Sequence, residues 1–191
     1  MLDIVYFLIG TFVLVWILTF ILLSKDIFKT GAVKVHKVKI RKKESFWVIM
    51  LIYIICLGII IGTFIKTRPA TEWYNYIGAA MVFIGGLMRV YARKALGRFF
   101  SFQVVIQKGH KLITTGVYKY TRHPMYLSMT LILFGLAIAL SSLYGVIVLL
   151  ILYVPAVLYR ISAEEELLIK EFGNDYLNYM EKTKKMIPYL Y

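Results

Sequence analysis

Long apolar runs separated by short polar segments dominate the chain and predict membrane-spanning helices. A helix that crosses a bilayer needs about 20 predominantly apolar residues. Five segments meet or approach that length: residues 2–23, 46–65, 75–96, 125–141 and 143–159. The last two are shorter and are separated only by Ser141 and Ser142, so they predict a tight helical hairpin. The expected fold class is an all-α integral membrane protein with about five transmembrane helices.

The charged residues between the apolar segments set the expected orientation. Residues 25–45 carry eight Lys and Arg, and residues 89–123 carry eight with no acidic residue. The connection 66–74 has few charges and the hairpin turn has none. Because Lys and Arg in short loops stay in the cytoplasm, we expect the loops 25–45 and 97–124 on that side. Five crossings then place the N-terminus outside and residues 160–191 inside.

Composition and charge limit the classes of protein and partner. Apolar residues make up 60% of the 191 positions, more than the roughly 45–50% of soluble domains, and the length indicates one domain, 1–191. The net charge of +13 does not indicate nucleic-acid binding, because basic residues beside apolar segments attract anionic membrane lipids. Cys56 is the single cysteine, and His36, His110 and His123 lack the spacing of a helical metal motif. We expect no metal and no nucleic acid.

The domain divides into residues 1–96, which supply three membrane helices, and residues 97–191, which carry the candidate chemistry. The connection 97–124 has 28 residues. Loops of that length within a compact domain are usually functional or disordered. His123 and Pro124 close this loop and also fit an ordinary helix start, since proline suits the first helical turn. Both interpretations can hold together.

A charged cluster follows the last apolar segment. Arg160 and Glu164 are four residues apart, so they share one face of a helix. An intrahelical ion pair would explain this spacing, and Ser162 with Glu165 fits a capping box. We favour a functional role for Arg160 and Glu164, because Arg160 ends a membrane span, where a polar group is costly. Glu165 and Glu166 alone would be typical of a solvated face.

Beyond Arg160 the chain becomes amphipathic. Apolar residues recur there at three- and four-residue spacing: Leu168, Phe172, Tyr176, Tyr179 and Met180. This predicts a helix that lies on the membrane surface or covers the cytoplasmic loops, weakened at Gly173 and Asn174. Pro155, in the last turns of the fifth segment, predicts a kink there.

The motifs together resemble one enzyme family. They are Gly116-x-Tyr-x-Tyr-x-Arg-His-Pro-x-Tyr126, the hairpin, Arg160-x-x-x-Glu164-Glu165-x-x-Leu168, Phe172-Gly173-x-x-Tyr176 and Ile187-Pro188. From near Gln103 to the C-terminus, the combination resembles the isoprenylcysteine carboxyl methyltransferases, as a short prokaryotic-type member with five helices. Arg-His-Pro-x-Tyr with Glu-Glu is shared with phospholipid N-methyltransferases. Val117 and Ser128 stand where relatives commonly have Pro and Gly.

The resemblance implies a cofactor, a substrate and a set of site residues. Relatives bind S-adenosylmethionine at the cytoplasmic end of the helices, leave S-adenosylhomocysteine as product, and accept a lipid-bearing prenylcysteine from the membrane. By motif, the cofactor pocket would be lined by Gln103, His110, Lys111, Leu112, Ile113, Tyr118, His123, Pro124, Met125 and Tyr126. Glu164 would hold the cofactor and Arg160 the substrate carboxylate, which makes these two the expected catalytic residues. The sequence leaves open whether Glu164 or Glu165 contacts the cofactor.

The implied reaction is displacement at a sulfonium methyl group by a carboxylate oxygen, which gives a methyl ester. An ionised carboxylate needs no general base, so catalysis would rest on alignment and desolvation. One alternative is a phospholipid or amine N-methyltransferase, for which a substrate-binding Arg160 would be unfavourable. A second is an NADPH-dependent membrane reductase of the sterol type. A transporter fits less well, because its polar groups would lie near the membrane midplane.

Overall fold

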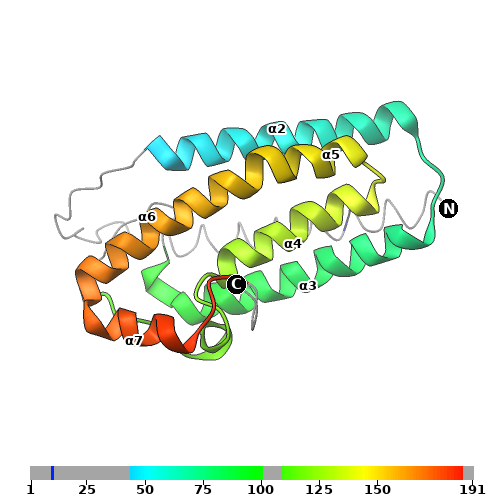
Figure 1. Ribbon diagram of the computed structural model, residues 1–191. Helices are drawn as coiled ribbons and strands as arrows, with labels where there is room; N and C mark the ends of the chain where they lie inside the picture. Colours follow the sequence, from blue (N-terminus) through cyan, green and yellow to red (C-terminus); the bar gives the residue numbers. More distant parts are fainter. Residues whose placement is uncertain (1–9, 11–43, 101–108, 187–191) are drawn as a thin grey trace.

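The computed structural model describes residue 10, residues 44–100 and residues 109–186, and this part of the chain is built from helices (Figure 1). The elements are α2 (Glu44–Thr67), α3 (Trp73–Leu96), α4 (Pro124–Ala139), α5 (Leu143–Val148), the π-helical η3 (Leu149–Tyr153), α6 (Val154–Phe172), α7 (Asn174–Lys182) and the 3-10 turns η1 (Gly97–Phe99) and η2 (Gly116–Lys119). The predicted all-α class and four of the five predicted segments are confirmed as helices. The segment 2–23 lies outside the described residues.

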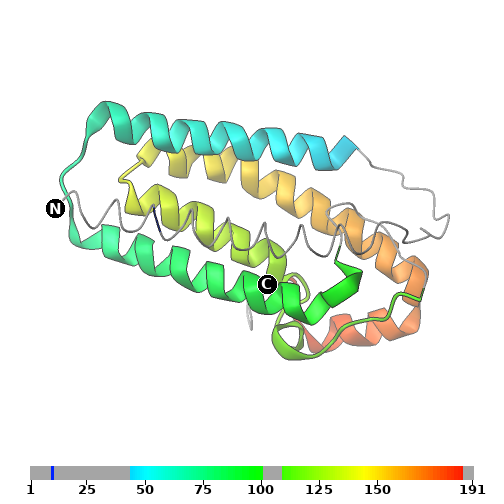
Figure 2. The same ribbon diagram turned by 180° about the vertical axis from the view of Figure 1, so that it is seen from behind.

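The four long helical runs lie lengthwise beside one another, as Figures 1 and 2 show from opposite sides. Helices α3 and α4 pack most closely, and glycines make this approach possible. A Cβ atom on Gly78 would lie 2.6 Å from the carbonyl oxygen of Gly135, and one on Gly135 would lie 2.7 Å from the carbonyl oxygen of Gly78. Gly85 is equally tight, with a Cβ position 2.8 Å from the Ser128 carbonyl oxygen. Small residues let helix backbones approach in this way in membrane proteins.

The predicted hairpin turn is present between α4 and α5 and is tied to the start of α3. Ser142 caps α5, since its hydroxyl accepts a hydrogen bond from the Gly145 amide at 3.1 Å. The buried Asn75 side chain of α3 donates to the carbonyls of Ile138 and Ala139 and to the Ser141 hydroxyl, at 2.8–3.1 Å. These bonds satisfy carbonyls that the end of α4 would otherwise leave unpaired.

The last predicted membrane segment, 143–159, is part of a longer helical run. Helical structure continues without a break from Leu143 to Phe172 and includes the predicted helix face of Arg160 and Glu164. Ser162 lies inside α6 and donates to the Leu158 carbonyl, so the alternative explanation of Ser162 and Glu165 as a capping box does not hold. A π-helical stretch, η3, directly precedes Pro155. The wider turns accommodate a proline that cannot donate to the turn before it.

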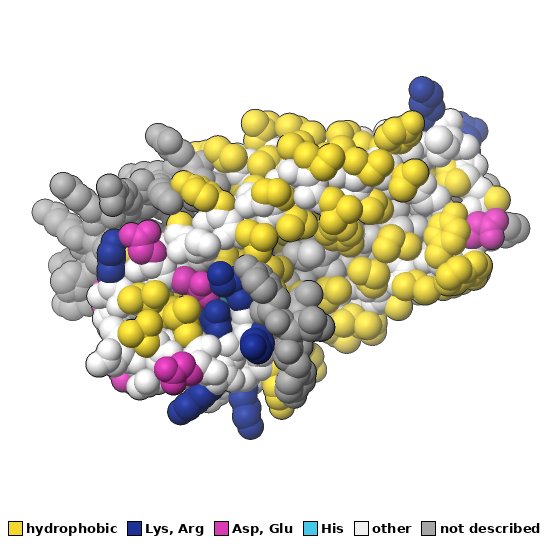
Figure 3. Space-filling view, in the orientation of Figure 1, with side chains coloured by type: hydrophobic (Ala, Val, Ile, Leu, Met, Phe, Trp, Pro, Cys, Tyr) yellow, Lys and Arg dark blue, Asp and Glu magenta, His cyan; other side chains and the backbone are white. Residues whose placement is uncertain are grey.

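The outside of the bundle is apolar, as in a membrane protein. Figure 3 shows hydrophobic side chains along the length of the helices, with charged ones towards the ends. Two helices, Trp47–Thr67 and Leu143–Phe172, are long and apolar enough to cross a membrane, and both are mostly exposed rather than buried as soluble core helices are. Pro124–Ala139 is a shorter apolar helix. The number of crossings and their orientation stay predictions.

Candidate active site

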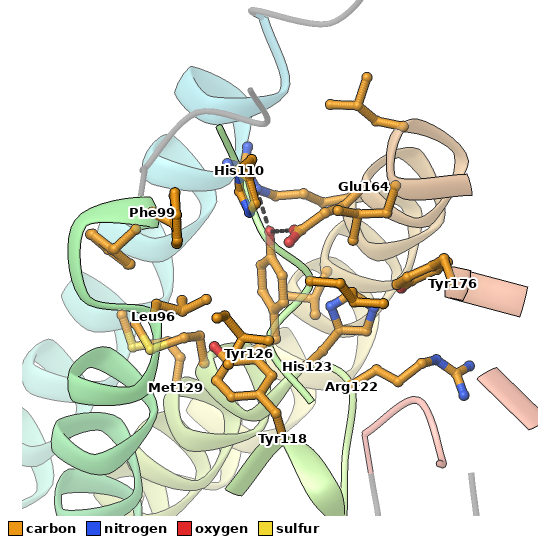
Figure 4. A pocket seen from close by; sticks show the side chains of 18 of the residues that line it. Leu96, Phe99, His110, Tyr118, Arg122, His123, Tyr126, Met129, Glu164 and Tyr176 are labelled. Carbon is orange, nitrogen blue, oxygen red and sulfur yellow. Dashed lines mark hydrogen bonds between the residues drawn. The ribbon is translucent and has the colours of Figure 1, made fainter. Parts of the chain in front are cut away.

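A cavity of about 300 Å³ opens at the end of the bundle opposite the α4–α5 turn. Its walls come from five parts of the chain: α2, the end of α3 with η1, the segment 109–123, the start of α4, and the run from η3 to α7. Figure 4 shows side chains from these elements pointing towards a common space. The site therefore depends on folding of the whole described bundle.

Arg160 and Glu164 meet at this cavity through a third side chain, Tyr126. The Arg160 Nε donates to the Tyr126 hydroxyl oxygen at 2.9 Å, and that hydroxyl donates to Glu164 Oε2 at 2.8 Å (Figure 4). Arg160 is only 5% exposed. The shared helix face predicted for Arg160 and Glu164 is therefore present. Tyr126, from the first turn of α4, links their charges and fixes the positions of both.

Glu165 is not on a solvated face, and that prediction is wrong. It is 6% exposed and lies 2.9 Å from Arg122 Nε, 3.3 Å from His123 Nε2 and 3.3 Å from Lys185 Nζ. A carboxylate in this position balances several cationic or donor groups out of reach of water. Glu166, by contrast, is exposed and pairs with Lys170 at 2.7 Å, as expected for a surface residue.

Hydrogen bonds and the ion pairs of Glu165 hold residues 183–186 against the loop that ends at His123. We call residues 183–186 the C-terminal strap. The amides of Arg122 and His123 donate to the Lys184 and Lys185 carbonyls at 2.9 and 3.1 Å. The Arg122 side chain also donates to the carbonyl of Thr183. Tyr179 of α7 adds a 2.6 Å hydrogen bond to the Tyr118 carbonyl. Helix α7 and the C-terminal strap thus pack against the loop that ends at His123, which agrees with one of the two placements predicted for the amphipathic segment.

One wall of the cavity is aromatic and holds two polar atoms that have no hydrogen-bond partner in the described part of the chain. The His110 ring stacks on Phe99 at 4.8 Å and meets Phe172 edge-on at 5.8 Å. Burial lowers the pKa of His110 below its usual value, so the ring is neutral near pH 7. Among the described residues, neither His110 Nδ1 nor the Tyr176 hydroxyl has a hydrogen-bond partner. Buried polar atoms normally have partners, so this wall is suited to bind a polar ligand.

Comparison with known proteins places the chain in a family. The model of the phospholipid methyltransferase family matches residues 73–175, from the start of α3 to the start of α7. This chain belongs to the phospholipid methyltransferase family. The match begins some 30 residues before the start expected from the motifs near Gln103, so α3 is part of the family's core rather than a general hydrophobic helix.

Several curated relatives of this phospholipid methyltransferase family member are named as isoprenylcysteine O-methyltransferases. A probable protein-S-isoprenylcysteine O-methyltransferase of Oryza sativa subsp. indica is 31% identical over 121 residues, covering 62% of this chain and 63% of the relative. The protein-S-isoprenylcysteine O-methyltransferase of Saccharomyces cerevisiae is 30% identical over 123 residues, covering 63% of this chain and 52% of the relative. The match spans less than two thirds of the length of either relative. The predicted resemblance is confirmed at the level of the family.

Most of the residues that the resemblance assigned to the site line the cavity of this family member. They are His110, Lys111, Leu112, Ile113, Tyr118, His123, Met125, Tyr126, Arg160 and Glu164. Pro124 does not line it: the residue is fully buried in the first turn of α4, where it starts the helix. Gln103 lies outside the described residues. Which of the lining residues contact a ligand stays a prediction.

A second group of lining residues, which the sequence motifs do not predict, lies deeper in the bundle. They are Met50 and Tyr53 of α2, Arg89 of α3, Met129 of α4 and Tyr153 of η3. Apolar and aromatic residues in membrane segments give no local signal of a cavity, since they look like any lipid-facing or packing residue. Arg89 did give a signal. The positive-inside pattern groups Arg89 with the charges of the cytoplasmic loop, but the residue lies well inside α3.

Proposed function

We propose that this chain transfers a methyl group from S-adenosylmethionine to the carboxylate of a prenylated cysteine, giving a methyl ester. The observation that carries the proposal is the buried Arg160 guanidinium, joined to Glu164 through Tyr126 in the wall of the cavity. The charged groups that line the cavity are mainly cationic: Arg89, Lys111, Arg122 and Arg160 against Glu164. A cationic cavity favours an anionic acceptor over the amine that an N-methyltransferase would use. The names of the curated relatives agree with this choice.

The described residues fit the chemical groups of S-adenosylmethionine. Glu164 supplies a carboxylate for the amino or ribose groups of the cofactor. His110 Nδ1 and the Tyr176 hydroxyl have no protein partner in the described part of the chain and can hydrogen-bond a purine or a ribose. Aromatic faces such as those of Phe99 and Tyr118 attract a positively charged sulfonium. When bound, the cofactor supplies an electrophilic methyl group, and S-adenosylhomocysteine is the product.

Arg160 would align the acceptor. Its Nε is held by Tyr126, which fixes the plane of the guanidinium, and a planar guanidinium binds a carboxylate through two parallel hydrogen bonds. The acceptor carboxylate is ionised near pH 7 and needs no base, so positioning and the exclusion of water supply the rate enhancement. Burial raises the pKa of Tyr118 and of Tyr176, so these phenols stay protonated and act as hydrogen-bond donors.

The lipid part of the acceptor would reach the cavity from the bilayer. We place the cavity at the cytoplasmic face, because the loop 97–124 that forms part of its wall is rich in Lys and Arg. Five crossings, with the N-terminus outside, complete the proposed topology. Helix α7 and the C-terminal strap would then lie at the membrane surface and shield the reaction from water.

Replacing Glu164 by glutamine is expected to weaken binding of S-adenosylhomocysteine by about 10-fold or more, because a charge-assisted contact is lost. A glutamine oxygen can still accept from the Tyr126 hydroxyl, so the local geometry should persist. Calorimetric titration measures the change without turnover. Glu166→Gln, at an exposed position on the same helix, is the matched control and should bind normally. Equal losses in the two variants would mean that Glu164 does not face the cofactor.

Replacing Tyr176 by phenylalanine is expected to leave the free energy of unfolding nearly unchanged while weakening S-adenosylhomocysteine binding by about fivefold. The reason is that the Tyr176 hydroxyl has no partner within the described residues, so only a ligand can use it. Tyr179→Phe is the contrasting variant. It removes the 2.6 Å bond to the Tyr118 carbonyl and should cost about 1–3 kcal/mol of stability. Tyr176→Phe that destabilises the protein yet binds normally would contradict the assignment.

The class of the enzyme is tested by the choice of cofactor. Titration of the purified protein with S-adenosylhomocysteine should give saturable binding, and titration with NADPH should give none. NADPH binding alone would favour the reductase alternative and overturn the proposed reaction.

A further inference from the structure

Glu165 lies beside the cavity but does not line it. Consecutive residues on an α-helix point about 100° apart, so Glu164 faces the cavity while Glu165 faces the C-terminal strap and the loop that ends at His123. The Glu165 Oε1 atom lies 2.9 Å from Arg122 Nε and 3.3 Å from His123 Nε2. Its Oε2 atom lies 3.3 Å from Lys185 Nζ. A carboxylate whose two oxygens have these partners within the protein is not placed to receive a hydroxyl or amino group of a cofactor.

The backbone of His123 is held on both sides. The residue precedes Pro124, which restricts the backbone of the residue before it. The His123 amide donates to the Lys185 carbonyl at 3.1 Å, and the His123 carbonyl accepts from the Tyr126 and Leu127 amides at 3.1 Å. The side chain is almost entirely buried. The remaining freedom of this side chain is the orientation of its ring and the choice of the nitrogen that carries the hydrogen.

The hydrogen bond to Glu165 fixes both of these. Arg122 and Lys185 favour the ionised form of Glu165, and an ionised carboxylate only accepts hydrogen bonds. The His123 Nε2 atom must therefore carry a hydrogen in order to bond Glu165. In the neutral ring Nδ1 is then a bare acceptor, and it has no hydrogen-bond partner in the described part of the chain. Because His123 lines the cavity, this acceptor is available to a ligand.

We propose that Glu165 is a positioning residue, which holds His123 as the tautomer with the hydrogen on Nε2 so that Nδ1 accepts a hydrogen bond from the cofactor. The inference rests on the proposed binding of S-adenosylmethionine in the cavity, where the amino and ribose hydroxyl groups of the cofactor are the donors. Neighbouring glutamates then have different tasks, because Glu164 contacts the ligand and Glu165 acts through His123. Arg122 is not a second route to the ligand, since its guanidinium donates to two backbone carbonyls and its side chain extends away from the cavity (Figure 4).

The tautomer is tested directly by NMR of the ring nitrogens in the wild-type protein, prepared with isotope-labelled histidine in detergent. The chain has three histidines, so replacement of His36 and of His110 by glutamine, one at a time, assigns the His123 signals. The expected spectrum shows a hydrogen on Nε2 and none on Nδ1. Saturating S-adenosylhomocysteine should shift the Nδ1 signal towards that of a hydrogen-bonded nitrogen. A hydrogen on Nδ1, or an Nδ1 signal that saturating ligand leaves unchanged, would overturn the proposal.

A double-mutant cycle in ligand binding separates positioning from direct contact. Glu165→Gln is expected to weaken S-adenosylhomocysteine binding by about fivefold, because a glutamine amide can donate as well as accept and no longer fixes the tautomer. His123→Ala should give a similar loss. In the His123→Ala background, Glu165→Gln should add nothing, because its effect passes through the missing ring. Losses that multiply in the double variant would place Glu165 in contact with the ligand and overturn the proposal.

Glu166→Gln is the matched control, since Glu166 is exposed on the same helix. It should change neither the affinity nor the His123 signals. If Glu165→Gln lowers the melting temperature but leaves the tautomer and the affinity unchanged, Glu165 has a structural role only and the proposal is overturned. Failure of the wild type to bind S-adenosylhomocysteine would overturn the proposed function as well, whereas normal binding with a hydrogen on Nδ1 would overturn this inference alone.

Discussion

Replacing Arg160 by alanine is expected to slow methyl transfer to a prenylcysteine acceptor by about 10- to 150-fold, which corresponds to the roughly 1.5–3 kcal/mol of a charge-assisted hydrogen bond. Binding of S-adenosylhomocysteine should change much less, because in this account the cofactor contacts Glu164. The measurement is the initial rate with labelled S-adenosylmethionine, with calorimetry on the same preparations.

Arg160→Lys is the informative partner variant. A lysine keeps the positive charge but offers one point of contact instead of a planar fork, and it cannot be oriented by Tyr126 as the Arg160 Nε is. Partial rescue of the rate is therefore expected. Because Arg160 is buried, the melting temperature of each variant is needed to separate lost catalysis from lost folding. Near-normal methyl transfer together with loss of cofactor binding would assign Arg160 to the cofactor site and contradict its proposed role in aligning the acceptor carboxylate.

Replacing Glu165 by alanine is expected to have the largest effect on stability, a loss of about 3–5 kcal/mol in the free energy of unfolding. The substitution leaves Arg122 and Lys185 without the carboxylate that balances them, in surroundings where the Glu165 side chain is 8% exposed. The C-terminal strap should then separate from the loop at His123. Chemical denaturation in detergent measures the loss.

Glu166→Ala is the control for that loss. Its side chain is 57% exposed and its ion pair with Lys170 lies at the surface, so the expected change is within about 0.5 kcal/mol. If Glu165→Ala is no less stable than Glu166→Ala, the buried cluster does not hold the C-terminal strap in place.

The helices could be predicted from the sequence because a bilayer demands long apolar runs. The predicted segments 46–65 and 75–96 correspond to α2 (Glu44–Thr67) and α3 (Trp73–Leu96) within a few residues. The turn at Ser141 and Ser142 could be predicted because only these two residues separate the last two apolar segments. The apolar segment 143–159 ends before Arg160 while α6 continues to Phe172, because hydropathy changes there but helical hydrogen bonding does not. The composition of a segment indicates whether a helix lies in lipid or in water, but it does not indicate where the helix ends.

The site could be predicted only in part, for a different physical reason. Three consecutive glutamates, Glu164 to Glu166, point in three directions around α6, and the sequence cannot say which one is buried. Glu165 is buried because Arg122 and Lys185 reach it from segments far along the chain. Such contacts leave no local pattern. Arg89 could have been recognised, since a charge inside an apolar segment indicates a function.

The central claim is tested most directly by the chemical stability of the transferred methyl group. The purified protein is incubated with methyl-labelled S-adenosylmethionine and either a prenylcysteine or phosphatidylethanolamine, and each product is treated with base. The account predicts label in the prenylcysteine product that base releases as methanol, which is the behaviour of an ester. Base-stable label in phosphatidylethanolamine, with none in prenylcysteine, would show an N-methyltransferase and contradict the account.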